Sequence, residues 1–305
     1  MGVPTRPWLP VLAVAVTLVL WASAFVAVRH LGQDFDPGAL SLGRLLVGAA
    51  CLGVAAVATG VRRPTRRDAL TIVVIGVLWF AIYNLALNEG ERRVDAGTAA
   101  MLIQISPVLI AVLAALFLAE RFTVWLVLGL GLAFAGVALI SLSGTPEGDR
   151  DVVGVVLCLV CALVYSVSLI LQKPLLARLS AVQVVWMACT TGAVVCLPFA
   201  GGLIEQTAVA PTSSVLWLVY LGIFPTAIAF TTYAYALRHM SASGLGVTTY
   251  LVPPITIVLG FLLLDEVPPP LAYVGGVLAL VGVAVARRRP RPKVAPAVEK
   301  VPDPV

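Results

Sequence analysis

The sequence predicts an all-α integral membrane protein with ten transmembrane helices, arranged as two inverted five-helix repeats. Three observations support this: an apolar composition, apolar runs of membrane-spanning length, and a spacing of proline, glutamate and glycine that occurs twice. Of the 305 residues, 60% are hydrophobic and 11% are charged, and the mean hydropathy is +1.04. A soluble domain has about 45–50% apolar and about 25% charged residues. Most of the chain is therefore expected to lie in lipid.

Apolar runs separated by charges, glycines and prolines mark the ten candidate helices. A helix needs about 20 apolar residues to cross the hydrocarbon core of a bilayer. The runs occupy residues 8–29, 38–59, 69–88, 95–118, 123–143, 152–172, 181–200, 213–237, 242–264 and 269–286. Because the segments between them are short, the sequence leaves no room for a soluble catalytic domain.

The distribution of lysine and arginine predicts the orientation in the membrane. With the N-terminus inside, fifteen of the 20 basic residues lie on the cytoplasmic side and four on the outer side. Cytoplasmic loops are enriched in these residues, so both termini are predicted to be cytoplasmic, in a plasma membrane. Residues 1–7 are predicted to be a cytoplasmic N-terminal segment, and residues 287–305 are predicted to be a disordered basic cytoplasmic tail. The same loops account for the net charge of +5, and no nucleic-acid partner is expected.

A repeated spacing divides the chain into related halves, residues 8–143 and 152–286. At an offset of 146 residues, Pro107, Glu120, Gly129 and Gly136 match Pro253, Glu266, Gly275 and Gly282, and Gly76 matches Gly222. An odd number of spans in each half makes the second copy enter the membrane from the opposite side. Inverted repeats are typical of secondary transporters, in which the substrate site lies near the midplane between the repeats.

These residues resemble those of the drug/metabolite transporter superfamily, specifically its EamA-type members. The resemblance rests on Trp21-Ala-Ser-Ala-Phe25, Arg44, the stretch from Ala96-Gly97 through Pro107 to Leu118-Ala-Glu120, and a second copy from Pro253 to Leu264-Asp-Glu266. It covers about residues 8–287. It implies a central cavity lined mainly by helices 1, 3, 4, 6, 8 and 9, and export or exchange of small metabolites such as amino acids. It implies no particular substrate, because members of the family differ widely in what they carry.

A charge within a predicted helix is the first candidate for the substrate site. Arg44 lies about seven residues from the predicted outer end of its helix. A charge at such depth costs at least about 2.5–3.5 kcal/mol on insertion scales, so Arg44 should face the protein interior or a cavity. It either attracts an anionic group such as a substrate carboxylate, or is a structural charge that bonds backbone carbonyls or extends outward.

Two prolines are predicted to break helices 4 and 9. Pro107 and Pro253 leave the carbonyls of Ile103 and Thr249 without their helical hydrogen bonds. Broken helices supply polar backbone where it lines a cavity, so a gating or site-lining role is favoured over a packing kink. Gln104 lies on the same helix face as Pro107, three residues earlier.

Aromatic and amide side chains away from the predicted helix ends complete the candidate cavity. A cavity with apolar walls and a few polar groups would bind a small amphipathic solute, although core packing is the alternative for each residue. The cavity candidates are Trp21, Arg44, Trp79, Tyr83, Asn84, Gln104, Tyr165, Tyr233 and Tyr250.

The repeated glycines and glutamates are expected to be structural. Glycines seven residues apart lie on one helix face, where small residues let another helix approach closely. They therefore provide contact with a neighbouring helix or a face for a homodimer. Glu120 and Glu266 are expected to be solvated or capping carboxylates at helix ends.

The leading functional prediction is a secondary transporter that moves amino acids or related solutes by alternating access, in export or exchange. The alternatives are an intramembrane enzyme and a membrane sensor without transport activity. An enzyme would need catalytic groups at depth, but His30 and His239 lie at opposite faces. No acidic residue lies near a predicted midplane, which leaves the energy source open. Cys158 and Cys161 form a CxxC without further ligands nearby, so no metal or cofactor is expected; the partners are the substrate and the lipid bilayer.

Overall fold

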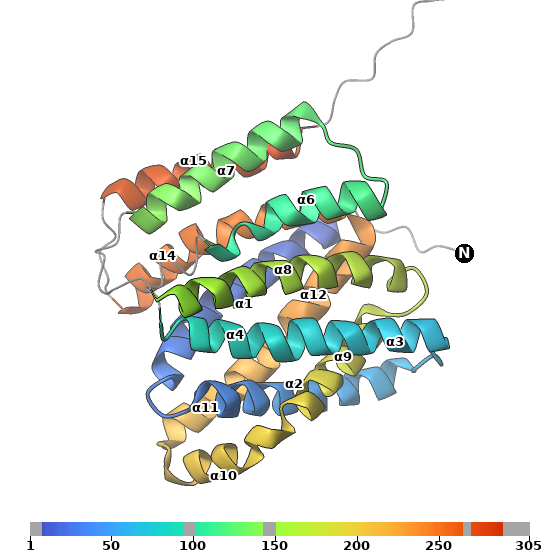
Figure 1. The fold of residues 1–305 in the computed structure, drawn as a ribbon, viewed down its shortest axis with the longest axis vertical. Coiled ribbons are helices and arrows are strands. Elements are labelled where there is room, and N and C mark those ends of the chain that lie inside the picture. Colours follow the sequence, from blue (N-terminus) through green and yellow to red (C-terminus); the bar gives the residue numbers. More distant parts are fainter. Residues whose placement is uncertain (1–7, 94–101, 143–150, 265–269, 289–305) are drawn as a thin grey trace, which may run out of the picture.

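The computed structural model describes residues 8–93, 102–142, 151–264 and 270–288, and in these ranges the chain is helical without a strand (Figure 1). The first half contains α1 (Trp8–Leu31), α2 (Pro37–Thr59), α3 (Arg66–Ile75), η1 (Gly76–Ile82), α4 (Tyr83–Gly90), α6 (Ser106–Phe117) and α7 (Val124–Leu142). The second half contains α8 (Val152–Leu175), α9 (Ala181–Val195), η2 (Leu197–Phe199), α10 (Ala200–Val209), α11 (Thr212–Leu221), η3 (Gly222–Ile228), α12 (Ala229–His239), α13 (Ala242–Gly246), η4 (Val247–Leu251), α14 (Val252–Leu264) and α15 (Pro270–Ala286).

Several of these helical stretches have the length and composition of membrane spans. Within the described residues six qualify: Trp8–Phe25, Pro37–Thr59, Arg66–Gly90, Val152–Leu175, Thr212–His239 and Ala242–Leu259. A bent pair, Ala181–Val195 and Leu197–Val209, meets at 54° and gives a seventh if it is one span. Three shorter apolar helices are Ser106–Phe117, Val124–Ile140 and Tyr273–Ala286. The fold is that of a multi-pass membrane protein, but length and composition do not confirm the predicted number of ten.

The two halves share the same helix irregularities at the offset found in the sequence. Both η1 and η3 are seven-residue π-helical segments, and each begins at a repeated glycine, Gly76 or Gly222. Pro107 and Pro253 are each the second residue of a helix, α6 and α14. A π-helical turn is rare and is often found at functional sites. Its recurrence at equivalent positions indicates that the halves follow one architectural plan.

Helices of one half pack mainly on helices of the other half. The pairs include α1 with α12, α2 with α9, α4 with α8, and α7 with α15. In addition, η1 packs on α9 while η3 packs on α2, so the same pairing occurs twice with the halves exchanged. Two repeats related by a two-fold axis would produce such an exchange, and a cavity between them is lined by both.

The repeated glycines bring α7 and α15 together along one edge of the molecule (Figure 1). A Cβ atom added at Gly136 would lie 2.5 Å from the backbone nitrogen of Ala279, and one at Gly275 would lie 2.5 Å from the carbonyl oxygen of Gly136. Gly129 and Gly282 meet Ala286 and Ala133 in the same way. The glycines thus provide contact between neighbouring helices of one chain, the first of the two uses expected from the sequence.

Polar contacts join the segments that connect the helices to one another at each of two opposite ends of the bundle. At the first, called the Asp36 end, Arg92 lies 3.7 Å from Asp36. At the second, called the Asp68 end, Arg178 pairs with Asp68. Other Asp36-end pairs are Arg93–Asp151 and Ser214–Asp34. The Asp36 end collects residues from predicted outer segments, and the Asp68 end collects residues from predicted cytoplasmic segments.

Candidate functional site

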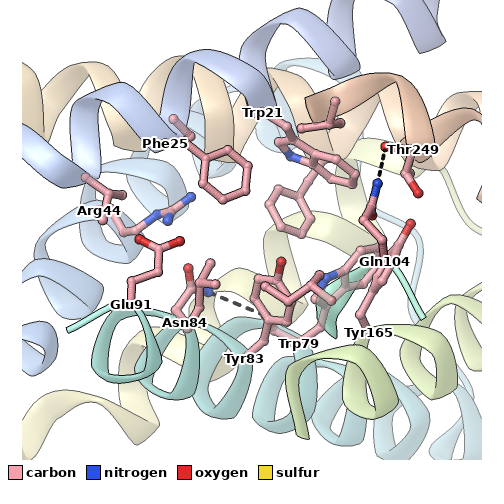
Figure 2. A pocket seen from close by; sticks show the side chains of 16 residues that line it. Trp21, Phe25, Arg44, Trp79, Tyr83, Asn84, Glu91, Gln104, Tyr165 and Thr249 are labelled. Atoms are coloured by element: carbon pink, nitrogen blue, oxygen red, sulfur yellow. Dashed lines mark hydrogen bonds between the residues drawn. The ribbon is translucent and has the colours of Figure 1, made fainter. Parts of the chain in front are cut away.

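A pocket lies between the two halves (Figure 2). It encloses about 750 Å³, its open mouth included. Its walls come from α1, α2, η1, α4, α8, α12, η4 and α14 and from the residues before α6. These segments belong to the predicted helices 1, 2, 3, 4, 6, 8 and 9. They therefore include all six helices that the family resemblance implies, together with helix 2. Seven of the nine cavity candidates line it: Trp21, Arg44, Trp79, Tyr83, Asn84, Gln104 and Tyr165.

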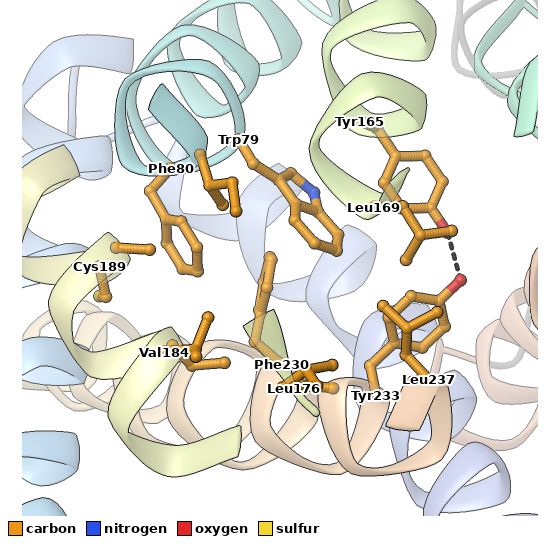
Figure 3. Close-up of a cluster of buried hydrophobic side chains, with 14 of the residues drawn as sticks. Trp79, Phe80, Tyr165, Leu169, Leu176, Val184, Cys189, Phe230, Tyr233 and Leu237 are labelled. Atoms are coloured by element: carbon orange, nitrogen blue, oxygen red, sulfur yellow. Dashed lines mark hydrogen bonds between the residues drawn. The ribbon is translucent and has the colours of Figure 1, made fainter. Parts of the chain in front are cut away.

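Aromatic rings form part of the pocket wall and pack together in a buried cluster (Figure 3). The ring centre of Trp79 lies 5.1 Å from the ring centres of both Tyr165 and Phe230. The hydroxyl of Tyr165 is hydrogen-bonded to that of Tyr233 at 2.5 Å, and Tyr233 also packs on Trp21 with ring centres 4.7 Å apart. Each such aromatic pair contributes about 0.5–1.5 kcal/mol beyond the area it buries. Tyr233 therefore supports the pocket wall from behind, although it was predicted to line the cavity.

Tyr250 lies outside the pocket, in a separate apolar cluster with Val247 and Leu130. It belongs to η4, a 3₁₀ segment in which side chains three residues apart share a face. Thr249 and Val252 are separated by that interval and both line the pocket. The side chain of Tyr250, one residue after Thr249, is directed elsewhere and packs toward α7.

Arg44 is buried, with 5% of its surface exposed, and its guanidinium points into the pocket (Figure 2). Its Nε donates to Oγ1 of Thr226 at 3.2 Å. The Thr226 hydroxyl donates in turn to the carbonyl of Leu221 at 2.8 Å, which leaves its lone pairs free to accept from Arg44. This bond joins α2 to η3 of the other half and fixes one side of the guanidinium. Arg44 is therefore held structurally and also presents its charge to the pocket.

Glu91 also lines the pocket, and it was not among the predicted site residues. The sequence placed the helix end at residue 88, but α4 continues to Gly90 and Glu91 is its C-terminal cap. The carboxylate of Glu91 faces the guanidinium of Arg44 (Figure 2), and the two charges interact. A signal was present in the spacing: Asn84, Leu87 and Glu91 fall on one helix face, and all three line the pocket.

The two helix breaks are joined to each other beside the pocket. Nε2 of Gln104 donates to the carbonyl of Thr249 at 2.9 Å, the carbonyl freed by Pro253. The carbonyl of Ile103, freed by Pro107, accepts a hydrogen bond from the Ser106 hydroxyl at 2.5 Å. Both freed carbonyls thus have partners, as buried backbone groups require. Pro107 and Pro253 create the breaks without lining the pocket, and their gating role stays a prediction.

Two further polar groups belong to the pocket wall. Asn84 donates through Nδ2 to the carbonyl of Phe80 at 2.7 Å, which holds the amide beside the site. The indole nitrogen of Trp21 is buried and has no hydrogen-bond partner among the described residues. A buried donor without a partner is costly, so a polar atom of a bound solute would stabilise it.

Charged residues at the Asp36 end connect the two halves. Arg93 donates to Glu89 at 2.6 Å and to Asp151 at 2.9 Å. The backbone N–H of Val153 and the Arg93 side chain lower the pKa of Asp151 below its ordinary value. Asp151 is therefore ionised at neutral pH. Its ion pair with Arg93 joins the segment after α4 to the beginning of α8.

The CxxC cysteines contribute to packing behind this wall. Cys158 and Cys161 are free and buried, and the Cys161 thiol donates weakly to the carbonyl of Tyr83 at 3.5 Å. Among the residues that the structure describes, no group of three or more histidine, cysteine or acidic residues could hold a metal ion.

Comparison with known proteins places this architecture among membrane transporters. The model of the EamA-like transporter family matches residues 8–142 and 152–288. A protein from Streptantibioticus cattleyicolor, named "Probable terminal-alkyne amino-acid exporter", is 40% identical over 277 residues, covering 91% of this chain and 93% of that protein. The uncharacterized transporter YdfC of Bacillus subtilis is 34% identical, covering 87% of this chain and 86% of YdfC. A crystal structure of a protein at 22% identity shares the fold, with a TM-score of 0.76, covering 91% of this chain and 96% of that one.

Proposed function

This chain belongs to the EamA-like transporter family, and from that premise we propose that it exports amino acids or related small metabolites across the plasma membrane by alternating access. The family and the transporter-named relatives point to a multi-pass transporter of small solutes rather than an enzyme. In this proposal all ten predicted helices cross the membrane as inverted repeats, with both termini in the cytoplasm.

The observation that carries the substrate assignment is the buried guanidinium of Arg44 in a largely aromatic pocket. A guanidinium binds a carboxylate through two parallel hydrogen bonds, and it is less strongly hydrated than an ammonium group. Trp21, Trp79 and Phe230 offer apolar surface for the remainder of the solute. A small molecule with one carboxylate and an apolar side chain fits this combination, and the name of the Streptantibioticus relative supports the same class.

The shape of the pocket supports alternating access. The pocket extends from the aromatic rings to Glu91 at the Asp36 end, whereas Leu169, Leu176 and Leu237, which do not line the pocket, pack with these rings in one buried cluster (Figure 3). With the Asp36 end outside, this conformation faces outward. Because each pairing between the halves recurs with the halves exchanged, a complementary arrangement can close the Asp36 end and open the Asp68 end.

Transport can be tested with the purified full-length chain in proteoliposomes. We expect saturable uptake of apolar amino acids that is accelerated when unlabelled substrate is preloaded on the other side. Arg44→Gln should raise the KM roughly 10- to 100-fold, because a hydrogen bond to a charged group contributes about 1.5–3 kcal/mol. Arg62→Gln is the matched control, because Arg62 is exposed outside the pocket.

The results separate transport from substrate recognition. Absence of saturable uptake by folded wild-type protein across a broad panel of amino acids and related metabolites would contradict the proposed function. Equal KM values for Arg44→Gln and Arg62→Gln would leave transport intact but would contradict the role of Arg44. Acceleration by preloading identifies exchange, whereas uptake that preloading does not accelerate shows that transport needs no substrate on the other side.

A further inference from the structure

We propose that Ser168 and Gln172 of α8 line a second section of the transport pathway, which is closed in this conformation and opens at the Asp68 end. In that section they offer hydrogen-bonding groups to the charged head of an amino acid. This inference rests on the proposed function and adds to it the residues that contact the solute at the Asp68 end. Neither residue lines the pocket.

The helices α1 and α8 occupy equivalent places in the two repeats. Each contains 24 residues, and they begin at Trp8 and Val152, 144 residues apart. The two matches to the EamA-like family begin at the same positions, 8 and 152. This interval is two residues shorter than the 146 that separates Pro107 and Pro253 later in the repeats. Residues of α1 and α8 therefore correspond at an interval of 144.

The part of α1 that lines the pocket has its counterpart on one face of α8. Four residues of α1, called the α1 set, line the pocket: Trp21, Ala24, Phe25 and Val28. Their counterparts, called the α8 set, are Tyr165, Ser168, Leu169 and Gln172. Residues with this spacing share one face of a helix. Tyr165 lines the pocket as Trp21 does, whereas the other three members of the α8 set are at most 1% exposed.

The two sets extend toward opposite ends of the bundle. The helix α1 ends at Leu31, five residues before Asp36. The helix α8 begins next to Asp151 at that same end, and it finishes three residues before Arg178 at the Asp68 end. The α1 set therefore runs toward the Asp36 end, and the α8 set runs about 10 Å toward the Asp68 end. Exchange of the halves in alternating access would uncover the α8 set.

The polar atoms of Ser168 and Gln172 have no use in this conformation. The Ser168 hydroxyl and both amide atoms of Gln172 are buried without a hydrogen-bond partner among the described residues. Ser166 shows the contrast, because its hydroxyl donates to the carbonyl of Ala162 at 2.6 Å. Unpartnered buried groups are rare and costly, so a second conformation in which they are bonded explains them. A hydroxyl and an amide both donate and accept, so they can bond the carboxylate and the ammonium group of a zwitterion.

Polar contacts between the halves lie at the end of the α8 set. Lys173, next to Gln172, lies 3.7 Å from Glu120, and its ammonium group donates to the carbonyl of Met240. Glu120 also accepts from the backbone nitrogen of Ala242 at 2.6 Å. These contacts join the segment after α6, in the first half, to α8 and to the connection between α12 and α13 in the second half. Opening at the Asp68 end requires them to separate.

Thiol accessibility from each face of the membrane tests the proposal. Ala24→Cys, Ser168→Cys and Gln172→Cys are made singly in the full-length chain, in right-side-out and inside-out membrane vesicles. A membrane-impermeant methanethiosulfonate is the probe, and wild type gives the background of the five native cysteines. Ser168→Cys and Gln172→Cys should react from the face opposite to that of Ala24→Cys. This comparison holds whichever face is cytoplasmic.

The matched control is Ser166→Cys. Ser166 is fully buried like Ser168, but it corresponds to Ala22, which is buried and does not line the pocket. Ser166→Cys should stay at the wild-type background from both faces. Saturable uptake with Ser168→Cys also at background, or reactive from the same face as Ala24→Cys, would overturn this inference and leave the proposed function in place. Reaction from opposite faces without uptake of any amino acid or related metabolite would support opening at the Asp68 end and contradict the proposed function.

A second measurement needs no added cysteine. Gln172→Leu removes the unpartnered amide and so stabilises this conformation at the expense of the other. Its thermal midpoint should rise, and its uptake should slow by roughly fivefold or more. Gln183→Leu is the control with the opposite sign, because the Gln183 amide bonds the backbone carbonyl and nitrogen of Arg62 at 2.5 and 3.1 Å, and its midpoint should fall. A fall for Gln172→Leu as well would show that Gln172 is bonded in the closed bundle and would overturn this inference.

Discussion

Replacing Gly136 with alanine should separate α7 from α15 and destabilise the protein. The added Cβ would lie 2.5 Å from the backbone nitrogen of Ala279 and 2.6 Å from the carbonyl oxygen of Gly275. Carbon atoms in favourable contact lie about 3.5–4.0 Å from their neighbours, so the helices must move apart by about 1 Å. Both obstacles are backbone atoms, which no change of side-chain rotamer can relieve. Overpacking of this kind costs about 1–3 kcal/mol.

Gly131 provides a control within the same helix. A Cβ added there meets nothing within 4 Å, so Gly131→Ala should gain only the helix propensity of alanine, about 0.5–1 kcal/mol. Gly136→Ala receives the same gain, which the steric cost exceeds. The free energies of unfolding of the two variants should therefore differ by about 1–3 kcal/mol.

Thermal unfolding of both variants in one detergent measures this difference. The unfolding midpoint of Gly136→Ala should fall below that of wild type, and the midpoint of Gly131→Ala should stay level or rise. Equal midpoints for the two variants would refute the close backbone contact between α7 and α15. A lower midpoint for Gly131→Ala alone would show that α7 packs through the face that carries Gly131 rather than through the face that carries Gly129 and Gly136.

Three further predictions concern single side chains. Glu120→Ala should lower the unfolding midpoint, because Glu120 accepts from the backbone nitrogens of Ala242 at 2.6 Å and Ser243 at 3.0 Å, and bonds to a charged group contribute about 1.5–3 kcal/mol each; an unchanged midpoint contradicts this. Tyr233→Phe should cost about 0.5–1.5 kcal/mol by removing the hydrogen bond between the Tyr233 and Tyr165 hydroxyls, measured against Tyr235→Phe as control. The lowered pKa of Asp151 stabilises the fold above the ordinary aspartate pKa of about 3.9, and this contribution is lost as pH falls through the lower folded value; thermal midpoints between pH 5 and 2.5 should fall less in Asp151→Asn than in wild type.

The sequence predicted features that depend on spacing along the chain, and it failed where side-chain direction depends on packing between helices. Depth in an apolar run located Arg44, and proline positions located the breaks beside Gln104 and Thr249. The prediction placed Tyr250 in the cavity because it lies beside a break, but the 3₁₀ geometry of η4 turns it away. Tyr233 lies one turn beyond Phe230 on α12, so the same helix face carries one ring into the pocket and the other behind it.

Glu91 was missed for a different physical reason. A charge at the end of an apolar run is normally solvated, and the run of helix 3 ended before it. In the structure the helix continues to Gly90, and the pocket reaches that end of the bundle. The glycine spacing likewise identified the close-packed faces of α7 and α15, but a spacing cannot specify that each face meets the other.

The framework of this transporter is repeated, whereas the chemistry of its pocket is not. Glycines and prolines recur 146 residues apart and set the π-helical segments and helix breaks of both halves. At that offset, the position equivalent to Arg44 is Thr190, and the position equivalent to Gln104 is Tyr250. In the function proposed above, a repeated framework would permit two conformations related by exchange of the halves, while an unrepeated charge would give the pocket one orientation for its solute. Exchanging Arg44 and Thr190 between the halves should therefore abolish binding rather than create an equivalent site, because Glu91 and the hydroxyl of Thr226 would remain beside the original position.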